Sequence, residues 1–104
     1  MKELSVHSLD LKEYLISSVR RALFSNVTRN IKYVVADLLG NKISIIFYFD
    51  GGIDDDDQEA VSVIETEVIA DFDNDFVIEA MTKYIDSSHV MENMNDLLVY
   101  LRKD

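Results

Sequence analysis

The sequence predicts a two-layer α/β sandwich of the α+β class, in which two helices cover a mostly antiparallel four-stranded sheet in the order α-β-β-α-β-β. Two segments repeat apolar residues at helical spacing, strand-like segments flank a two-residue turn, and no proline marks a linker. At 104 residues and 48% hydrophobic content, the chain is long and apolar enough for one buried core. Residues 1–104 are therefore expected to form a single domain.

The first helix is expected from Asp10 to Phe24. Asp10 is followed three residues later by Glu13, which is the pattern of a capping box. Apolar residues then recur at helical spacing, at Leu11, Leu15, Ile16, Val19, Ala22 and Leu23. Ser25 and Asn26 favour side-chain to backbone hydrogen bonds over continued helix, so the helix is expected to end there.

A β-hairpin is expected next, with strands from Ile31 to Leu38 and from Lys42 to Asp50. Gly40-Asn41 between them is a two-residue turn signal. The second strand alternates apolar residues at Ile43, Ile45, Phe47 and Phe49, and Ile46 and Tyr48 make its other face apolar as well. This strand is therefore expected to be central in the sheet, or to have its second face covered.

The second helix is expected from Asp55 to Asp71, because Val61, Ile64, Val68 and Phe72 follow helical spacing. The third strand is expected from Phe76 to Ile85, after the turn Asp73-Asn74-Asp75. A helix between the second and third strands allows one parallel crossover, which would be right-handed.

The C-terminal segment is compatible with two structures. Residues Asp86 to Asp96 are polar and irregular, and Leu97 to Lys103 are apolar enough for a fourth strand, which would form an antiparallel hairpin with the third. The alternative is a helix that begins at Val90 and uses Met91, Met94, Leu97, Leu98 and Leu101 as its apolar face. Periodicity alone does not separate the two structures, and the strand is the favoured prediction.

Negative charge is concentrated in one segment of the chain. The net charge is −10, yet no Lys or Arg occurs from Ile43 to Thr82, where twelve acidic residues fall. Such a field repels nucleic acid and anionic membranes and attracts basic protein surfaces. The residues expected to contact a partner are Asp50, Asp54, Asp55, Asp56, Asp57, Glu59, Glu67, Asp71 and Asp73.

The run from Asp54 to Asp57 also has a purely structural explanation. Acidic residues in the first turn of a helix complement its dipole, and an aspartate at the N-cap accepts hydrogen bonds from free amides. One or two acids suffice for that purpose, whereas four in a row repel one another. Helix capping and a partner-binding surface therefore both remain open for this run.

No pattern for catalysis, a metal or a cofactor is present. There is no cysteine, His7 and His89 lack ligand spacing, and an EF-hand loop counted from Asp55 has Ala60 where glycine is required. Ser17 and Ser18 lack a nucleophile elbow, and Glu65 and Glu67 point to different sides of their helix. We therefore expect that the chain is not an enzyme and that it binds neither a metal nor a cofactor. The N-terminus lacks signal-peptide features, so a cytoplasmic location is expected.

Several segments of the chain form a familiar series, namely Arg20 to Phe24, Phe47 to Gly51, the acidic helix start, Thr66 to Phe72 and the ending Val99 to Lys103. In these segments the sequence resembles a group of small bacterial proteins that look like immunity proteins of toxin systems, such as contact-dependent growth inhibition. The resemblance spans most of the chain from Val19 onward and favours the fourth strand over the helix. The sequence departs from the group at Asp86 to Asp96, which lacks a proline-containing loop.

Three hypotheses follow for the function. The first is an acidic immunity protein that neutralises a basic bacterial toxin, such as a nuclease, by covering its active site. The second is a small homo-oligomeric or adaptor protein without a toxin partner, for which a homodimer is possible. The third is a hydrolase or metal-dependent enzyme, which would need a convergent carboxylate site. The charge distribution and the resemblance favour the first.

Overall fold

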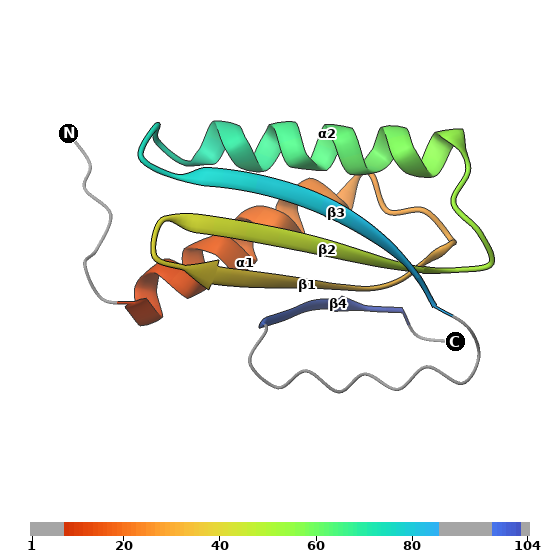
Figure 1. The fold of residues 1–104 in the computed structure, drawn as a ribbon, viewed down its shortest axis with the longest axis horizontal. Helices are drawn as coiled ribbons and strands as arrows, with labels where there is room; N and C mark the ends of the chain where they lie inside the picture. The colour runs from red at the N-terminus through yellow and green to blue at the C-terminus, as the bar shows by residue number, and fades with distance from the viewer. Residues whose placement is uncertain (1–7, 86–96, 103–104) are drawn as a thin grey trace.

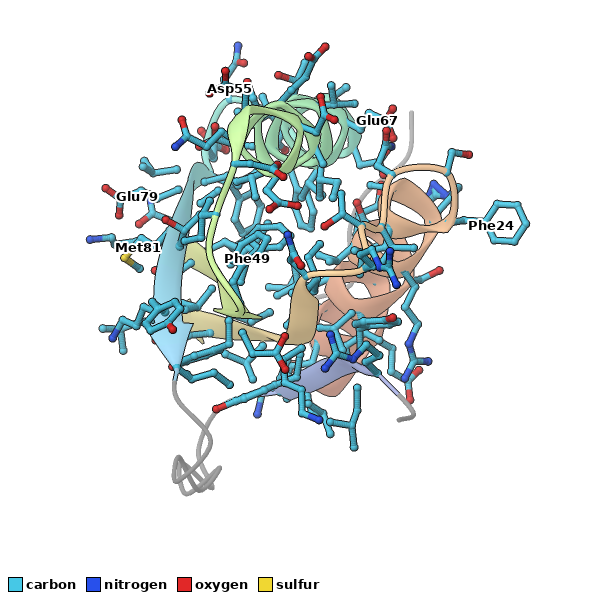
Figure 2. The ribbon with its side chains drawn as sticks, turned by 90° about the vertical axis from the view of Figure 1, so that its right-hand side faces the viewer. Phe24, Phe49, Asp55, Glu67, Glu79 and Met81 are labelled. Atoms are coloured by element: carbon cyan, nitrogen blue, oxygen red, sulfur yellow. The ribbon has the colours of Figure 1, made fainter. Side chains whose placement is uncertain are left out.

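Two helices lie on one side of a curved four-stranded sheet in the computed structural model, which describes residues 8–85 and 97–102 (Figure 1). Viewed along the strands, the sheet bends around both helices, and Phe49 points into the space between the layers (Figure 2). The elements are α1 (Ser8–Phe24), β1 (Ile31–Leu39), β2 (Lys42–Asp50), α2 (Asp55–Asp71), β3 (Val77–Ile85) and β4 (Leu97–Leu101). The predicted fold class and element order are confirmed.

The sheet is mixed and has the strand order β3-β2-β1-β4. β1 pairs antiparallel with β2 and with β4, whereas β2 and β3 are parallel and joined through α2. The predicted parallel crossover is thus present, but the predicted hairpin of the third and fourth strands is wrong. β3 pairs with the edge of β2 that the hairpin leaves free. β4 pairs with the other edge of β1, whose residues Tyr33 to Ala36 are all buried.

The β1–β2 hairpin forms as predicted around Gly40-Asn41. Gly40 has a φ of 62°, whereas no non-glycine residue of the described chain has a positive φ. A positive φ at the first loop residue alone is the pattern of a type II′ turn.

β2 contributes four fully buried side chains to the core beneath the helices: Ile43, Ile45, Phe47 and Phe49. β2 also pairs with a strand on each side, β3 and β1. The prediction that β2 is central is confirmed.

The helix termini differ in how well the sequence predicts them. α1 begins at Ser8, so Asp10 lies within the helix and cannot be its N-cap. The predicted capping box of Asp10 and Glu13 is therefore wrong. The C-terminus of α1 falls where predicted, because the Asn26 side chain donates to the carbonyl oxygen of Ala22 at 2.8 Å. α2 has the predicted bounds. None of the described helices is long and apolar enough to cross a membrane.

Arg102 fixes the C-terminal strand. Its guanidinium donates two hydrogen bonds to the Asp50 carboxylate, at 3.1 and 2.6 Å, and a third to the carbonyl oxygen of Arg29. Its backbone amide donates to the carbonyl oxygen of Lys32. The strand alternative is therefore confirmed for Leu97–Leu101, and the helical alternative is wrong for those residues. The predicted irregular segment 86–96 lies outside the described residues.

We expect Arg102→Ala to lower the free energy of unfolding by about 1–2 kcal/mol, because it removes charge-assisted bonds at a partly exposed pair. Arg102→Lys keeps the positive charge but loses the planar guanidinium, so its free energy of unfolding should lie between those of the wild type and Arg102→Ala. Urea denaturation measures the difference. Lys42→Ala serves as control, since the Lys42–Glu79 pair is more than half exposed. Equal effects of Arg102→Ala and Lys42→Ala would contradict the anchoring role.

Candidate functional site

The acidic run at the start of α2 forms a complete capping box. Gly51 and Gly52, with φ values of 92° and 109°, turn the chain from β2 towards the helix. Asp54 is the N-cap, and its Oδ1 accepts a hydrogen bond from the Asp57 amide at 2.9 Å. Asp57 Oδ2 in turn accepts from the Asp54 amide at 3.0 Å. Two of the four aspartates are therefore used to begin the helix.

Asp57 is also the buried acid of the fold, with 1% of its surface exposed. The Asn30 side-chain amide donates to its Oδ2 at 2.9 Å. The buried Thr28 hydroxyl interacts with the same carboxylate without full hydrogen-bond geometry. Burial by itself raises the pKa of Asp57, but the interactions with Asn30, Thr28 and Asp54 outweigh it, so the pKa is lowered. The carboxylate is thus charged, enclosed and turned away from any partner.

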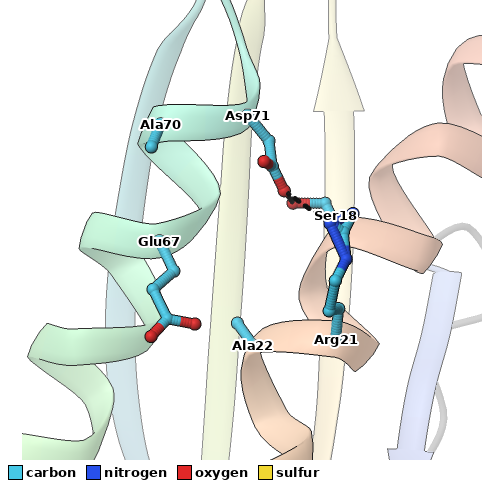
Figure 3. A pocket seen from close by; sticks show the side chains of 6 residues that line it. All are labelled: Ser18, Arg21, Ala22, Glu67, Ala70 and Asp71. Carbon is cyan, nitrogen blue, oxygen red and sulfur yellow. Dashed lines mark hydrogen bonds and ion pairs between the residues drawn. The ribbon is translucent and has the colours of Figure 1, made fainter.

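Asp71, at the opposite end of α2, joins the two helices. The Ser18 hydroxyl donates to its Oδ2 at 2.6 Å, and the Arg21 guanidinium lies 3.4 Å from the same oxygen (Figure 3). The Tyr14 hydroxyl donates to the Asp71 carbonyl oxygen at 2.6 Å. Tyr14, Ser18 and Arg21 are spaced four and three residues apart, so they share one face of α1. Asp71 therefore serves the packing of α1 against α2.

The exposed acids of α2 form a separate surface, which we call the acidic ridge and which consists of Asp55, Asp56, Glu59 and Glu67. Asp56, Glu59 and Glu67 lie three and eight residues apart, which puts them on one flank of the helix. Asp71 follows Glu67 by one turn and contacts α1, so this flank faces the α1 side. Asp55 and Glu67 point outward in Figure 2. The exposed N-cap Asp54 extends the ridge at its start.

A cleft between the helices lies beside Glu67. It has a volume of about 260 Å³ and is lined by Ser18, Arg21, Ala22, Glu67, Ala70 and Asp71 (Figure 3). That volume is below the roughly 300–1,000 Å³ typical of small-molecule sites. The two carboxylates on its wall outnumber its single guanidinium, so the cleft suits one cationic side chain better than an anion.

Two predicted contact residues lie apart from the ridge. Asp50 is held by Arg102, and Asp73 follows the C-terminus of α2, where its Oδ1 accepts from the Asp75 amide at 3.0 Å. A 17-residue helix is about 25 Å long, so Asp73 and Asp55 lie at opposite ends of it. The nine predicted residues thus form no single patch. Among the described residues, no cluster of three or more potential ligands is placed to hold a metal ion.

Sequence reasoning missed the partners of these acids. Asn30 is 27 positions from Asp57, and Ser18 is 53 positions from Asp71. The one available signal was Ser18 itself, a polar residue within the apolar stripe of the first helix. It is 1% exposed, which a solvated mid-helix serine would not be. His7 and His89, which lack metal-ligand spacing in the sequence, lie outside the described residues.

Comparison with known proteins gives one family. A family model described as MafI2 immunity protein matches residues 12–104. No curated protein matches the chain. The family match agrees with the resemblance to toxin immunity proteins, whereas it does not test the contact-dependent delivery system expected from that resemblance.

We expect Asp57→Asn to destabilise the fold by about 1–3 kcal/mol at neutral pH, because an amide replaces an acceptor that two donors face. The lowered pKa means that the carboxylate stabilises the fold above its ordinary value of 3.8, and that this stability is lost as pH falls through the lowered value. The difference between wild type and Asp57→Asn should therefore be constant near neutrality and shrink below about pH 4.

Denaturant unfolding between pH 7 and pH 3 measures this difference, with the exposed neighbour Asp56→Asn as control. Asp56→Asn should change stability only slightly at neutral pH. A difference between wild type and Asp57→Asn that is the same at pH 6 and pH 3 would contradict the assigned role of the Asp57 charge.

Proposed function

The chain belongs to the MafI2 immunity protein family, and we propose that it neutralises a cognate toxin by laying its acidic ridge over a basic active-site surface. The observation that carries the proposal is the outward placement of the four ridge acids. Within the described part of the chain, none of them takes part in an ion pair. They are therefore available to basic groups of another protein.

The fold gives no sufficient reason for these charges. Asp54 and Asp57 complete the capping box, and first-turn acids each gain about 0.3–1 kcal/mol from the helix dipole. That gain is confined to the first turn, so Glu59 receives little of it. Glu67 lies near the C-terminus of α2, where the dipole disfavours a negative charge. The position of Glu67 supports a role in binding over a role in stability.

A toxin that cuts nucleic acid fits this surface best. A nuclease active site must attract phosphates, so basic side chains surround it. A rigid row of carboxylates along a helix presents acceptor oxygens of the same charge, without a bond that the enzyme can cleave. Complementary charge also accelerates encounter, to about 10⁸–10⁹ M⁻¹s⁻¹ at low salt in favourable cases. We therefore propose a basic nuclease domain as the partner class and inhibition without catalysis as the mechanism.

The inter-helix cleft offers an anchor for such a partner. A lysine or arginine side chain inserted beside Glu67 would meet that carboxylate and the partly exposed carboxylate of Asp71. A partly buried contact of this kind slows dissociation, whereas exposed rim charges mainly set the association rate. The ridge and the cleft should consequently affect different rate constants.

Neutralising the ridge with Asp55→Asn, Asp56→Asn and Glu59→Gln should slow association at least tenfold at low salt and weaken its salt dependence. The measurement is stopped-flow or surface-based binding to a catalytically inactive form of the cognate toxin. The matched control is Glu13→Gln with Asp37→Asn and Asp75→Asn, which changes the net charge equally at exposed or partly exposed positions off the ridge and off β3. Equal slowing by both triple variants would rule out a specific role for the ridge.

Glu67→Gln should raise the dissociation rate by about three- to tenfold and leave the association rate nearly unchanged, since one interface charge pair is worth on the order of 1 kcal/mol. Thr66→Ala, at the adjacent exposed position, is the control for local effects on the helix. A Glu67→Gln variant with wild-type dissociation would exclude the cleft as an anchor and leave the role of the ridge intact.

A further inference from the structure

We propose that two copies of this chain associate through their β3 strands, which pair antiparallel about Met81 and join the two sheets into one of eight strands. The inference is independent of the proposed toxin-binding function. The proposed interface consists of the β3 edge of the sheet and the flank of α2 beside β3, on the side of α2 away from the inter-helix cleft. The inference rests on the hydrogen-bonding parity, the charges and the apolar residues of β3.

β3 is a nine-residue edge strand, and edges of that length are usually blocked or paired. The opposite edge strand, β4, has five residues, and the Arg20 side chain donates to its Val99 carbonyl oxygen. On β3, the Glu65 side chain accepts from the Ala80 amide at 3.1 Å. Large apolar side chains are exposed on both faces of β3, with Tyr84 at 64% and Val77 at 56%.

The backbone groups of β3 alternate in direction. The Val77 amide donates to the carbonyl oxygen of Asn41, the residue that precedes β2, so the odd-numbered residues of β3 turn their backbone groups towards β2. The Ala80 amide points away from β2, since its acceptor is Glu65 of α2. The outward-facing residues are therefore Ile78, Ala80, Thr82 and Tyr84.

A twofold axis at Met81 matches these outward groups with one another. Under this symmetry Ala80 stands opposite Thr82 of the second copy, and Ile78 stands opposite Tyr84. Each pair joins two outward-facing residues, which is the requirement for a hydrogen-bonded antiparallel pair. The Thr82 backbone then replaces Glu65 as the partner of the Ala80 amide. A register shifted by one residue would match inward groups with outward ones and form no ladder.

The same axis makes the side chains of β3 complementary to their own copies. Glu79 stands opposite Lys83 of the second copy, and this pair occurs twice. Both residues are exposed and lie on the sheet face turned away from the helices, as Figure 2 shows for Glu79 and Met81. Val77 stands opposite Ile85, and the two Met81 side chains meet at the axis. Opposite charges and apolar pairs directly across strands stabilise antiparallel pairing.

The flank of α2 next to this edge carries little charge. Glu65 defines the flank through its bond to β3, and Gln58, Ser62 and Ile69 share it by helical spacing. Ile69 is 47% exposed. Asp56 and Glu67 lie on the opposite flank, beside α1, whereas Asp55 lies next to Gln58 and Ser62 on the outer face of α2. Two α2 helices can therefore approach across the joined sheet without bringing Asp56 and Glu67 of the two copies together. An isologous contact of this kind closes as a dimer.

Charge reversal within β3 tests the register. Sedimentation velocity of the full chain should show a concentration-dependent dimer. Glu79→Lys or Lys83→Glu alone should weaken dimerisation at least tenfold, because each creates two like-charge pairs, and the double variant should restore it to within about threefold of wild type. Lys12→Glu and Glu13→Lys are the controls, being exposed reversals on α1. Thermal melts verify that every variant is folded.

Hydrogen exchange supplies a second readout. The outward amides of Ile78, Ala80, Thr82 and Tyr84 should gain protection as the concentration rises, whereas the amides bonded to β2 should be protected throughout. A monomer at every concentration would overturn the proposal. A dimer that Glu79→Lys and Lys83→Glu leave unchanged, or that the double variant does not restore, would also overturn it. A monomer whose β3 amides become protected only on adding the toxin would also overturn it, and would assign the edge to the partner.

Discussion

The buried carboxylate of Asp57 is the interaction on which the orientation of α2 depends. One oxygen accepts from the Asp54 amide and from the Asn30 side chain, and so ties the start of the helix to the residue that precedes β1. These hydrogen bonds lie just after Gly51-Gly52, where two consecutive glycines with positive φ give the backbone wide conformational freedom. A helix fixed at that point and held by Asp71 at its other end has one permitted rotation, which decides which acids face outward.

That fixed rotation divides one acidic segment into residues with different roles. Asp50, Asp57 and Asp71 hold distant parts of the chain together, through Arg102, Asn30 and Ser18 respectively. The ridge acids extend into solvent on the same helix. The charge of the segment is therefore neither wholly structural nor wholly a binding surface. A carboxylate surrounded by donors stabilises the fold, whereas one surrounded by water is available to a partner.

The two flanks of α2 differ in the same way. The flank beside α1 carries Asp56, Glu67 and the cleft at Glu67, while the flank beside β3 carries Gln58, Ser62 and Ile69 with Glu65 as its acid. The remaining ridge acids, Asp55 and Glu59, lie on the outer face between the two flanks. The cleft and the proposed β3 interface thus lie on opposite sides of one helix. One helix can serve both interfaces because its residues alternate between flanks with the helical period.

The sequence by itself determined the local structure and where charge gathers. Helical spacing in α2, the Gly-Asn turn and the alternation of β2 are encoded within a few residues, so the element order and the fold class could be predicted. The partner of β4 could not, because strands 97–101 and 31–39 meet only in the folded chain, and the Asp50–Arg102 contact spans 52 positions. The same limit applies to Asp57 and Asp55. They are the same residue type two positions apart, and only the packing of Asn30 against the helix start buries one and exposes the other.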